Sequence, residues 1–128
     1  MKNKQLFQEL ASWQWEISGY QKAAFMIEER LDIIHKNERA IPTETTKKVD
    51  NLQHRIIEEE EKLDALEKVL VNQKETLRTL NNSAEWQNRI EQQQQAIRKR
   101  VDTEKNVFSS LKSDYYNVLS EMLMKIAS

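Results

Sequence analysis

The 128-residue sequence has no cysteine, one glycine and one proline. Without cysteine the chain has no disulfide, no thiol nucleophile and no thiolate metal ligand, so we expect a protein of a reducing compartment, the cytoplasm. A single glycine cannot build a loop that cradles phosphate groups. The shortage of glycine and proline also leaves little material for turns and predicts long, uninterrupted helices.

The sequence also lacks an excess of charge of either sign and any long hydrophobic run. Its 20 basic and 21 acidic residues give a formal net charge of -1, so we expect no nucleic acid as a partner. The two short basic runs, 47–48 and 98–100, are interleaved with acidic residues and are interpreted as solvated helix faces. Polar residues interrupt the segment after the basic start, so we expect a soluble protein with neither signal peptide nor membrane span.

What the sequence does contain is a heptad pattern of apolar residues. In the first segment the pattern alternates strictly between steps of four and three: Leu6, Leu10, Trp13, Ile17, Tyr20, Ala24, Ile27, Leu31 and Ile34. This spacing is typical of a helix that packs in a coiled coil and predicts a helix over about 4–37. A turn over 38–43 should follow because Pro42 cannot continue a helix, and Thr43 is the expected N-cap of the next helix.

A second heptad seam predicts a helix over about 44–80. Its members are Val49, Leu52, Ile56, Glu59, Leu63, Leu66, Leu70, Gln73, Leu77 and Leu80. A turn over 81–83 should come next, with Asn82 and Glu85 spaced as a capping box at the start of the third helix.

The third seam predicts a helix over about 83–126. Its members are Trp86, Ile90, Gln93, Ile97, Val101, Glu104, Phe108, Leu111, Tyr115, Val118 and Met122. Two successive four-residue steps, from Gln93 through Ile97 to Val101, predict a stutter that locally unwinds the supercoil. The three helices predict a single all-α domain over 1–128, an antiparallel three-helix coiled-coil bundle that assembles further by oligomerisation.

Two polar layers interrupt the predicted core. Folding the chain about its turns places Gln73 opposite Gln93, where a buried hydrogen bond would fix the alignment of the helices. It also places Glu59 opposite Glu104, and two carboxylates in an apolar layer must share a proton, bind a cation or be neutralised by bases. Lys62, Arg100 and Lys105 are the candidate bases for an ion-pair cluster, and Tyr20 is a candidate hydrogen-bond donor.

A metal site at Glu59 and Glu104 is the alternative interpretation of the glutamate layer, since helical bundles can bind metals through inward glutamates and Glu-x-x-His pairs. The sequence departs from that pattern because His35 and His54 both fall off the core positions. We therefore expect no metal and no other cofactor. No serine is accompanied by an inward His and Asp, so we also expect no catalytic residues and no enzyme activity.

Apolar residues outside the seams point to a partner. On the first helix an outer stripe contains Trp15, Gly19, Met26 and Ile33, and a glycine in mid-helix suggests close approach of another helix. The end of the third helix adds Tyr116, Leu119, Leu123 and Ile126. These eight residues are the candidate interface. They predict a scaffold or adaptor that acts through protein–protein interaction and self-association as a homo-oligomer. The alternatives are a chaperone or assembly factor that holds a client helix, and a metal- or ligand-binding bundle.

Overall fold

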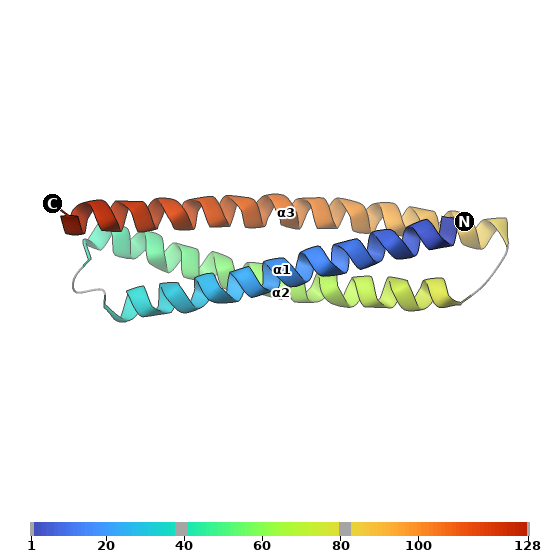
Figure 1. Cartoon of the computed structure of the whole chain (residues 1–128), viewed down its shortest axis with the longest axis horizontal. Coiled ribbons are helices and arrows are strands. Elements are labelled where there is room, and N and C mark those ends of the chain that lie inside the picture. The colour runs from blue at the N-terminus through green and yellow to red at the C-terminus, as the bar shows by residue number, and fades with distance from the viewer. Residues whose placement is uncertain (1, 38–40, 80–82, 128) are drawn as a thin grey trace.

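The computed structural model describes residues 2–37, 41–79 and 83–127, and for residues 2, 126 and 127 it describes the backbone alone. Three helices, α1 (Lys2–Lys36), α2 (Thr43–Arg78) and α3 (Ala84–Ala127), lie side by side along one long axis (Figure 1). The prediction of an all-α three-helix bundle is confirmed. None of the described helices has a stretch that is long and apolar enough to cross a membrane.

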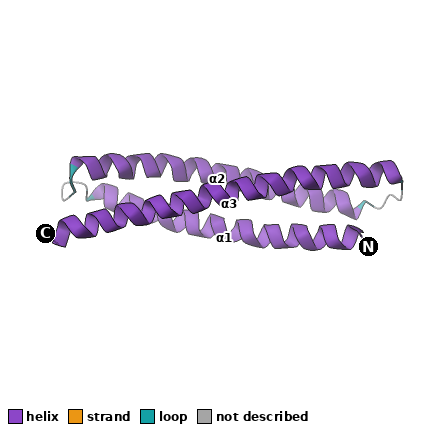
Figure 2. Ribbon diagram, turned by 90° about the horizontal axis from the view of Figure 1, so that it is seen from above, coloured by secondary structure: helices purple, strands orange, loops and turns teal. Residues whose placement is uncertain are grey.

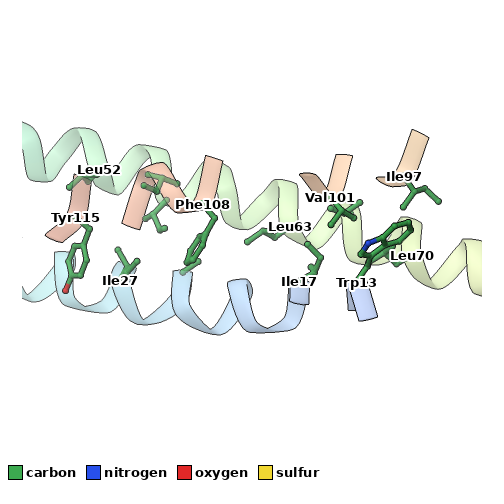
Figure 3. Packing of buried hydrophobic residues seen from close by; sticks show 14 of the residues in the cluster. Trp13, Ile17, Ile27, Leu52, Leu63, Leu70, Ile97, Val101, Phe108 and Tyr115 are labelled. Carbon is green, nitrogen blue, oxygen red and sulfur yellow. The ribbon is translucent and has the colours of Figure 1, made fainter. Parts of the chain in front are cut away.

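The core is a single column of apolar side chains between the three helices. In α1 the buried members are the predicted seam residues from Leu10 to Leu31, except Tyr20, which is partly buried like Leu6 and Ile34. In α2 every seam residue from Val49 to Leu77 is buried, whereas the predicted member Leu80 lies outside the described residues. Figure 3 shows Ile17, Leu63 and Val101, one from each helix, pointing toward one another in this column.

The seam of α3 corrects one prediction. Gln93 is exposed, and Gln94 takes its place in the core with 1% of its surface accessible. With Gln94 in the seam, the buried positions from Ile90 to Val118 alternate regularly between steps of four and three. The predicted stutter at 93–101 is therefore wrong, because the pattern that contains Gln94 keeps one face of a supercoiled helix toward its partners without unwinding.

The helices alternate in direction, so α2 runs antiparallel to both neighbours and α1 runs parallel to α3 (Figures 1 and 2). Ion pairs fix the alignment. Arg98 binds Glu9 at 2.7 Å and Lys105 approaches Glu16 at 3.9 Å, and the two partners are 89 residues apart in both pairs. The contact between α1 and α2 is the most extensive of the three helix pairs, and the contact between α1 and α3 is the least extensive.

The helix starts differ from the two predicted caps. Pro42, not Thr43, occupies the N-cap position of α2, and it offers no side-chain hydrogen bond because proline has no polar side-chain atom. At α3 the Ser83 hydroxyl accepts a hydrogen bond from the backbone N–H of Trp86 at 3.1 Å, as an N-cap residue does. The predicted cap residue, Asn82, lies outside the described residues.

Candidate interaction surface

The outward side of α1 carries three large apolar side chains in one row. Trp15 is 83% exposed, Met26 49% and Ile33 61%. A helix turns by about 100° per residue, so steps of about 11 and seven residues return to nearly the same direction. Ile17, two residues after Trp15, points to the other side of the helix and is buried. The outer stripe, defined here as Trp15, Gly19, Met26 and Ile33, thus faces away from the core.

Gly19 in this stripe has no structural role within one chain. A Cβ atom built at Gly19 would meet no heavy atom within 4 Å. Replacing Gly19 with Ala should therefore raise the free energy of unfolding by about 0.5–1 kcal/mol, because alanine loses less conformational entropy in a helix. Urea unfolding followed by circular dichroism at low protein concentration measures the change. The exposed Ala11→Gly replacement should lower stability by a similar amount, and a destabilised Gly19→Ala variant would contradict the open site.

A second exposed apolar group, the C-terminal patch, consists of Tyr116, Leu119 and Leu123. Tyr116 is 52% exposed and Leu123 68%, while Leu119 packs partly against the core. Tyr116 follows Lys105 by a helical repeat of 11 residues, and Lys105 approaches Glu16 of α1, so the patch lies on the side of α3 that faces α1. The side chain of the fourth predicted member, Ile126, lies outside the described residues.

Some exposed apolar residues were not identified by the sequence analysis, among them a pair that lies between α1 and α2. Phe25 of α1 and Ile57 of α2 are 55% and 44% exposed and border a shallow groove of about 340 Å³ between these helices. Glu28 and His54 also line this groove. The sequence pattern did not single out these two residues. Phe25 directly precedes Met26 of the outer stripe, and Ile57 directly follows the seam residue Ile56.

A groove of about 390 Å³ between α2 and α3 is lined by polar and charged side chains around Leu52. Lys48 binds Glu121 at 2.9 Å and Arg55 binds Asp114 at 2.9 Å, so ion pairs join the two walls of this groove. Hydrogen bonds from Lys48 and Lys125 lower the pKa of Glu121 to about 2. These basic side chains are therefore engaged by carboxylates of the same chain.

The glutamine layer links all three helices. The Gln73 side-chain amide donates to Oε1 of Gln94 at 3.0 Å, and Gln94 donates in turn to the backbone oxygen of Leu6 at 3.1 Å and to Glu9 at 3.2 Å. The predicted partner, Gln93, makes no such contact because it points to solvent. A side chain with one acceptor and two donor positions can satisfy three neighbours, and this explains why an amide occupies the layer.

The glutamate layer is the most strained electrostatic feature of the core. Glu59 is 1% exposed and Glu104 7%, and both carboxylate oxygens of Glu59 are buried without a hydrogen-bond partner. Burial first, and the charge of Glu104 second, raise the pKa of Glu59 to about 7, against a smaller opposing effect of Lys62. Glu59 is thus about half protonated at neutral pH, where an ordinary glutamate is ionised.

The expected companions of this layer are engaged elsewhere or exposed. The Tyr20 hydroxyl donates to Glu16 at 3.1 Å rather than to the glutamate layer, and burial together with that bond raises the pKa of Tyr20 to about 12. Lys105 approaches the same Glu16 at 3.9 Å. Lys62 and Arg100 are exposed. The predicted ion-pair cluster around the two glutamates is therefore not formed among the described residues.

A second carboxyl pair, which the sequence analysis missed, lies between α1 and α2. Burial first, and a hydrogen bond with Glu28 second, raise the pKa of Glu60 to about 7. Glu60 directly follows the seam position of Glu59, so the heptad pattern assigned it to solvent. A hydrogen bond between two carboxyl groups requires a proton on one of them, and the negative charges of Glu28 and Asp64 raise the pKa of Glu60 further.

No group of three or more potential ligands gathers into a metal site anywhere in the described ranges 2–37, 41–79 and 83–127. His35 instead approaches Asp50 at 3.1 Å, which joins α1 to α2, and His54 is exposed. The glutamate layer supplies only two carboxyl groups.

Comparison with known proteins adds no relative to these observations. No protein-family model, no curated protein and no solved structure matches the chain. Function is therefore inferred from the residues of this chain alone, and the two exposed apolar surfaces are the features that require an explanation.

Proposed function

We propose that this protein is a non-enzymatic helical scaffold or adaptor of the cytoplasm that acts through protein–protein interaction and self-association. The observation that carries the proposal is the outer stripe, in which Trp15, Met26 and Ile33 point away from the chain's own core. Isolated exposed apolar residues are common on soluble proteins, but three aligned over the length of one helix match the face of a helix that packs on another.

The energetics support association through this stripe. Burying a fully exposed large apolar side chain contributes about 1.5–3 kcal/mol. Since Trp15, Met26 and Ile33 are only partly exposed, the six side chains of two copies would contribute about 6–12 kcal/mol if buried fully. Association costs about 4–15 kcal/mol in lost freedom of motion. The free energy from burying these apolar side chains is therefore similar to the cost of association, as expected for a reversible assembly. Burial of the C-terminal patch would add to this free energy.

Light scattering over a wide concentration range tests the proposal. The wild-type chain should have a molar mass well above the 15.3 kDa of one copy, and a Trp15→Gln, Met26→Gln, Ile33→Gln variant should return to 15.3 kDa while remaining helical. A matched variant with Phe25→Gln, Ile57→Gln and Val71→Gln removes three other exposed apolar residues. That control should assemble like wild type.

A wild-type chain that stays at 15.3 kDa throughout would contradict self-association. That result would favour a second candidate function, a chaperone or assembly factor that holds a client helix on the C-terminal patch. The patch residues are spaced by three and four positions, the spacing of a helix face that packs on another helix: Tyr116, Leu119 and Leu123. Leu119 also packs against the core. An exposed patch of this kind should bind the dye ANS, and a Tyr116→Gln, Leu123→Gln variant should bind less of it than wild type, with the outer stripe supplying the remainder.

A further inference from the structure

We infer that the outer stripe pairs with the outer stripe of a second copy in an antiparallel arrangement, about a two-fold axis beside Met26. The inference rests on the proposed self-association and specifies its geometry. Under this symmetry Met26 faces Met26 of the second copy. Each step from Met26 toward one end of α1 then meets an equal step toward the other end in the second copy. Gly19 and Ile33, each seven residues from Met26, thereby come opposite each other. Lys22, four residues before Met26, comes within about 1.5 Å, one residue's rise, of the height of Glu29, three residues after it, and both lie on the same edge of the stripe. Arg30, which is level with Lys22, lies on the other edge.

The charges on the stripe favour this arrangement. Lys22 and Glu29 are exposed, and neither forms an ion pair with another residue in the part of the chain that the structure describes. They are separated by seven residues, so they lie on the same edge of the stripe. In the antiparallel pair the two-fold axis creates the Lys22–Glu29 contact twice. In a parallel pair Lys22 would instead face Lys22 of the second copy, and Glu29 would face Glu29, so like charges would repel.

The shape of the stripe agrees with the charges. Space around Gly19 is open within one chain, and the antiparallel pair brings the 61% exposed Ile33 of the second copy over it. Glycine lets two helix backbones approach closely because it has no side chain. Trp15, eleven residues before Met26, comes within one residue's rise of Lys36 of the second copy, ten residues after it, which allows a cation–π contact. The mid-helix glycine, costly in an isolated helix, gains a role in the pair.

A register shifted by one heptad fits less well. It sets Gly19 opposite Met26 and Ser12 opposite Ile33, so large residues again face small ones. However, that shift brings Lys22 of one copy against Lys22 of the other beside the axis, and like charges repel. The register centred on Met26 is the one that satisfies both shape and charge.

Charge reversal tests the pairing. Lys22→Glu and Glu29→Lys should each weaken self-association by about tenfold at low salt, because each variant turns two attractive contacts into repulsive ones. An equimolar mixture of the two variants should associate as tightly as wild type, since one copy then carries two glutamates and the other two lysines. Analytical ultracentrifugation of each variant and of the mixture measures this, with circular dichroism as the check on folding.

Single cysteines test the alignment independently, because the natural chain has none. Met26→Cys should form a disulfide-linked dimer under mild oxidation, since two residues beside the axis come within disulfide reach. Ser12→Cys should not, because antiparallel copies would hold the two positions about 40 Å apart. In a parallel pair Ser12→Cys would cross-link instead.

The outcomes separate this inference from the proposed function. A wild-type chain that remains monomeric overturns both. A wild-type oligomer whose association is unaffected by Lys22→Glu and Glu29→Lys, and whose Met26→Cys variant does not cross-link, overturns the register and leaves self-association standing. Loss of association in both charge variants, recovery in their mixture and cross-linking at Met26→Cys together establish the antiparallel pair.

Discussion

Replacing Glu59 with Leu is expected to raise the free energy of unfolding by about 3 kcal/mol at pH 8, a gain that should shrink toward pH 5. Glu59 is 1% exposed and its carboxylate oxygens are unpartnered, so ionisation in the folded chain is unfavourable. A leucine of similar volume would continue the apolar column without a charge to desolvate.

The pH dependence follows from the pKa of Glu59, which folding raises from its ordinary value of 4.5 to about 7. Below pH 4.5 the carboxyl group is protonated in both states and costs nothing through ionisation. Between pH 4.5 and 7 the unfolded chain releases the proton while the folded chain keeps it, so the stability of the wild type falls as pH rises. Above pH 7 the full cost is present.

Urea unfolding at a series of pH values measures this effect as the difference between wild type and variant. The difference is needed because Glu60, whose pKa is also raised to about 7, adds its own dependence to both proteins. Glu58→Leu is the matched control, since Glu58 is exposed and should give little change at any pH. A gain that is absent above pH 7, together with stabilisation of wild type alone by added divalent ions, would favour a cation at the glutamate layer.

The second large effect concerns the glutamine layer. Gln73→Leu and Gln94→Leu should each lower the free energy of unfolding by about 1–3 kcal/mol, because each leaves a buried amide group of the other glutamine without its partner. The double replacement should restore most of the loss, since no orphaned amide remains. Urea unfolding of all four proteins gives the coupling energy.

Gln93→Leu is the control for the glutamine layer because Gln93 is exposed next to the buried Gln94. It should change the stability by less than about 0.5 kcal/mol. If Gln93→Leu were the damaging replacement and Gln94→Leu neutral, the third helix would be rotated relative to the structure. Additive losses at Gln73 and Gln94 would show that the two amides do not share a hydrogen bond.

The heptad spacing predicted the bundle because burial of apolar residues on one face is a property of the sequence alone. The spacing from Ile90 onward is regular only with Gln94, but the seam from Trp86 then has two successive four-residue steps at its start. The pattern therefore left open the choice between Gln93 and Gln94, which are identical and adjacent. The choice depends on Gln73, which offers a donor, and on the backbone oxygen of Leu6, which offers an acceptor; both belong to other helices and come near only after folding. Polar positions in a core are therefore fixed by their partners rather than by their own hydrophobicity.

The same reason explains the two side chains that formed unexpected contacts. Tyr20 was a candidate donor to the glutamate layer, but Glu16 lies one helical turn away and accepts the hydrogen bond. Thr45, which the sequence analysis did not include in the second seam, is fully buried. It occupies the heptad position before Val49, and its hydroxyl donates to Glu121 of α3 at 3.2 Å.

The direction of the three helices has a mechanical consequence. Because the number of helices is odd, α1 begins near one end of the rod and α3 finishes at the other (Figure 1). A force applied between the two ends would act along the helix axes and slide the helices past one another, so all apolar layers would resist at once. The cross-helix pairs Arg98–Glu9 and Arg55–Asp114 would be loaded in the same direction. A bundle with these helix directions should therefore resist stretching between its ends better than a hairpin that is pulled open from one end.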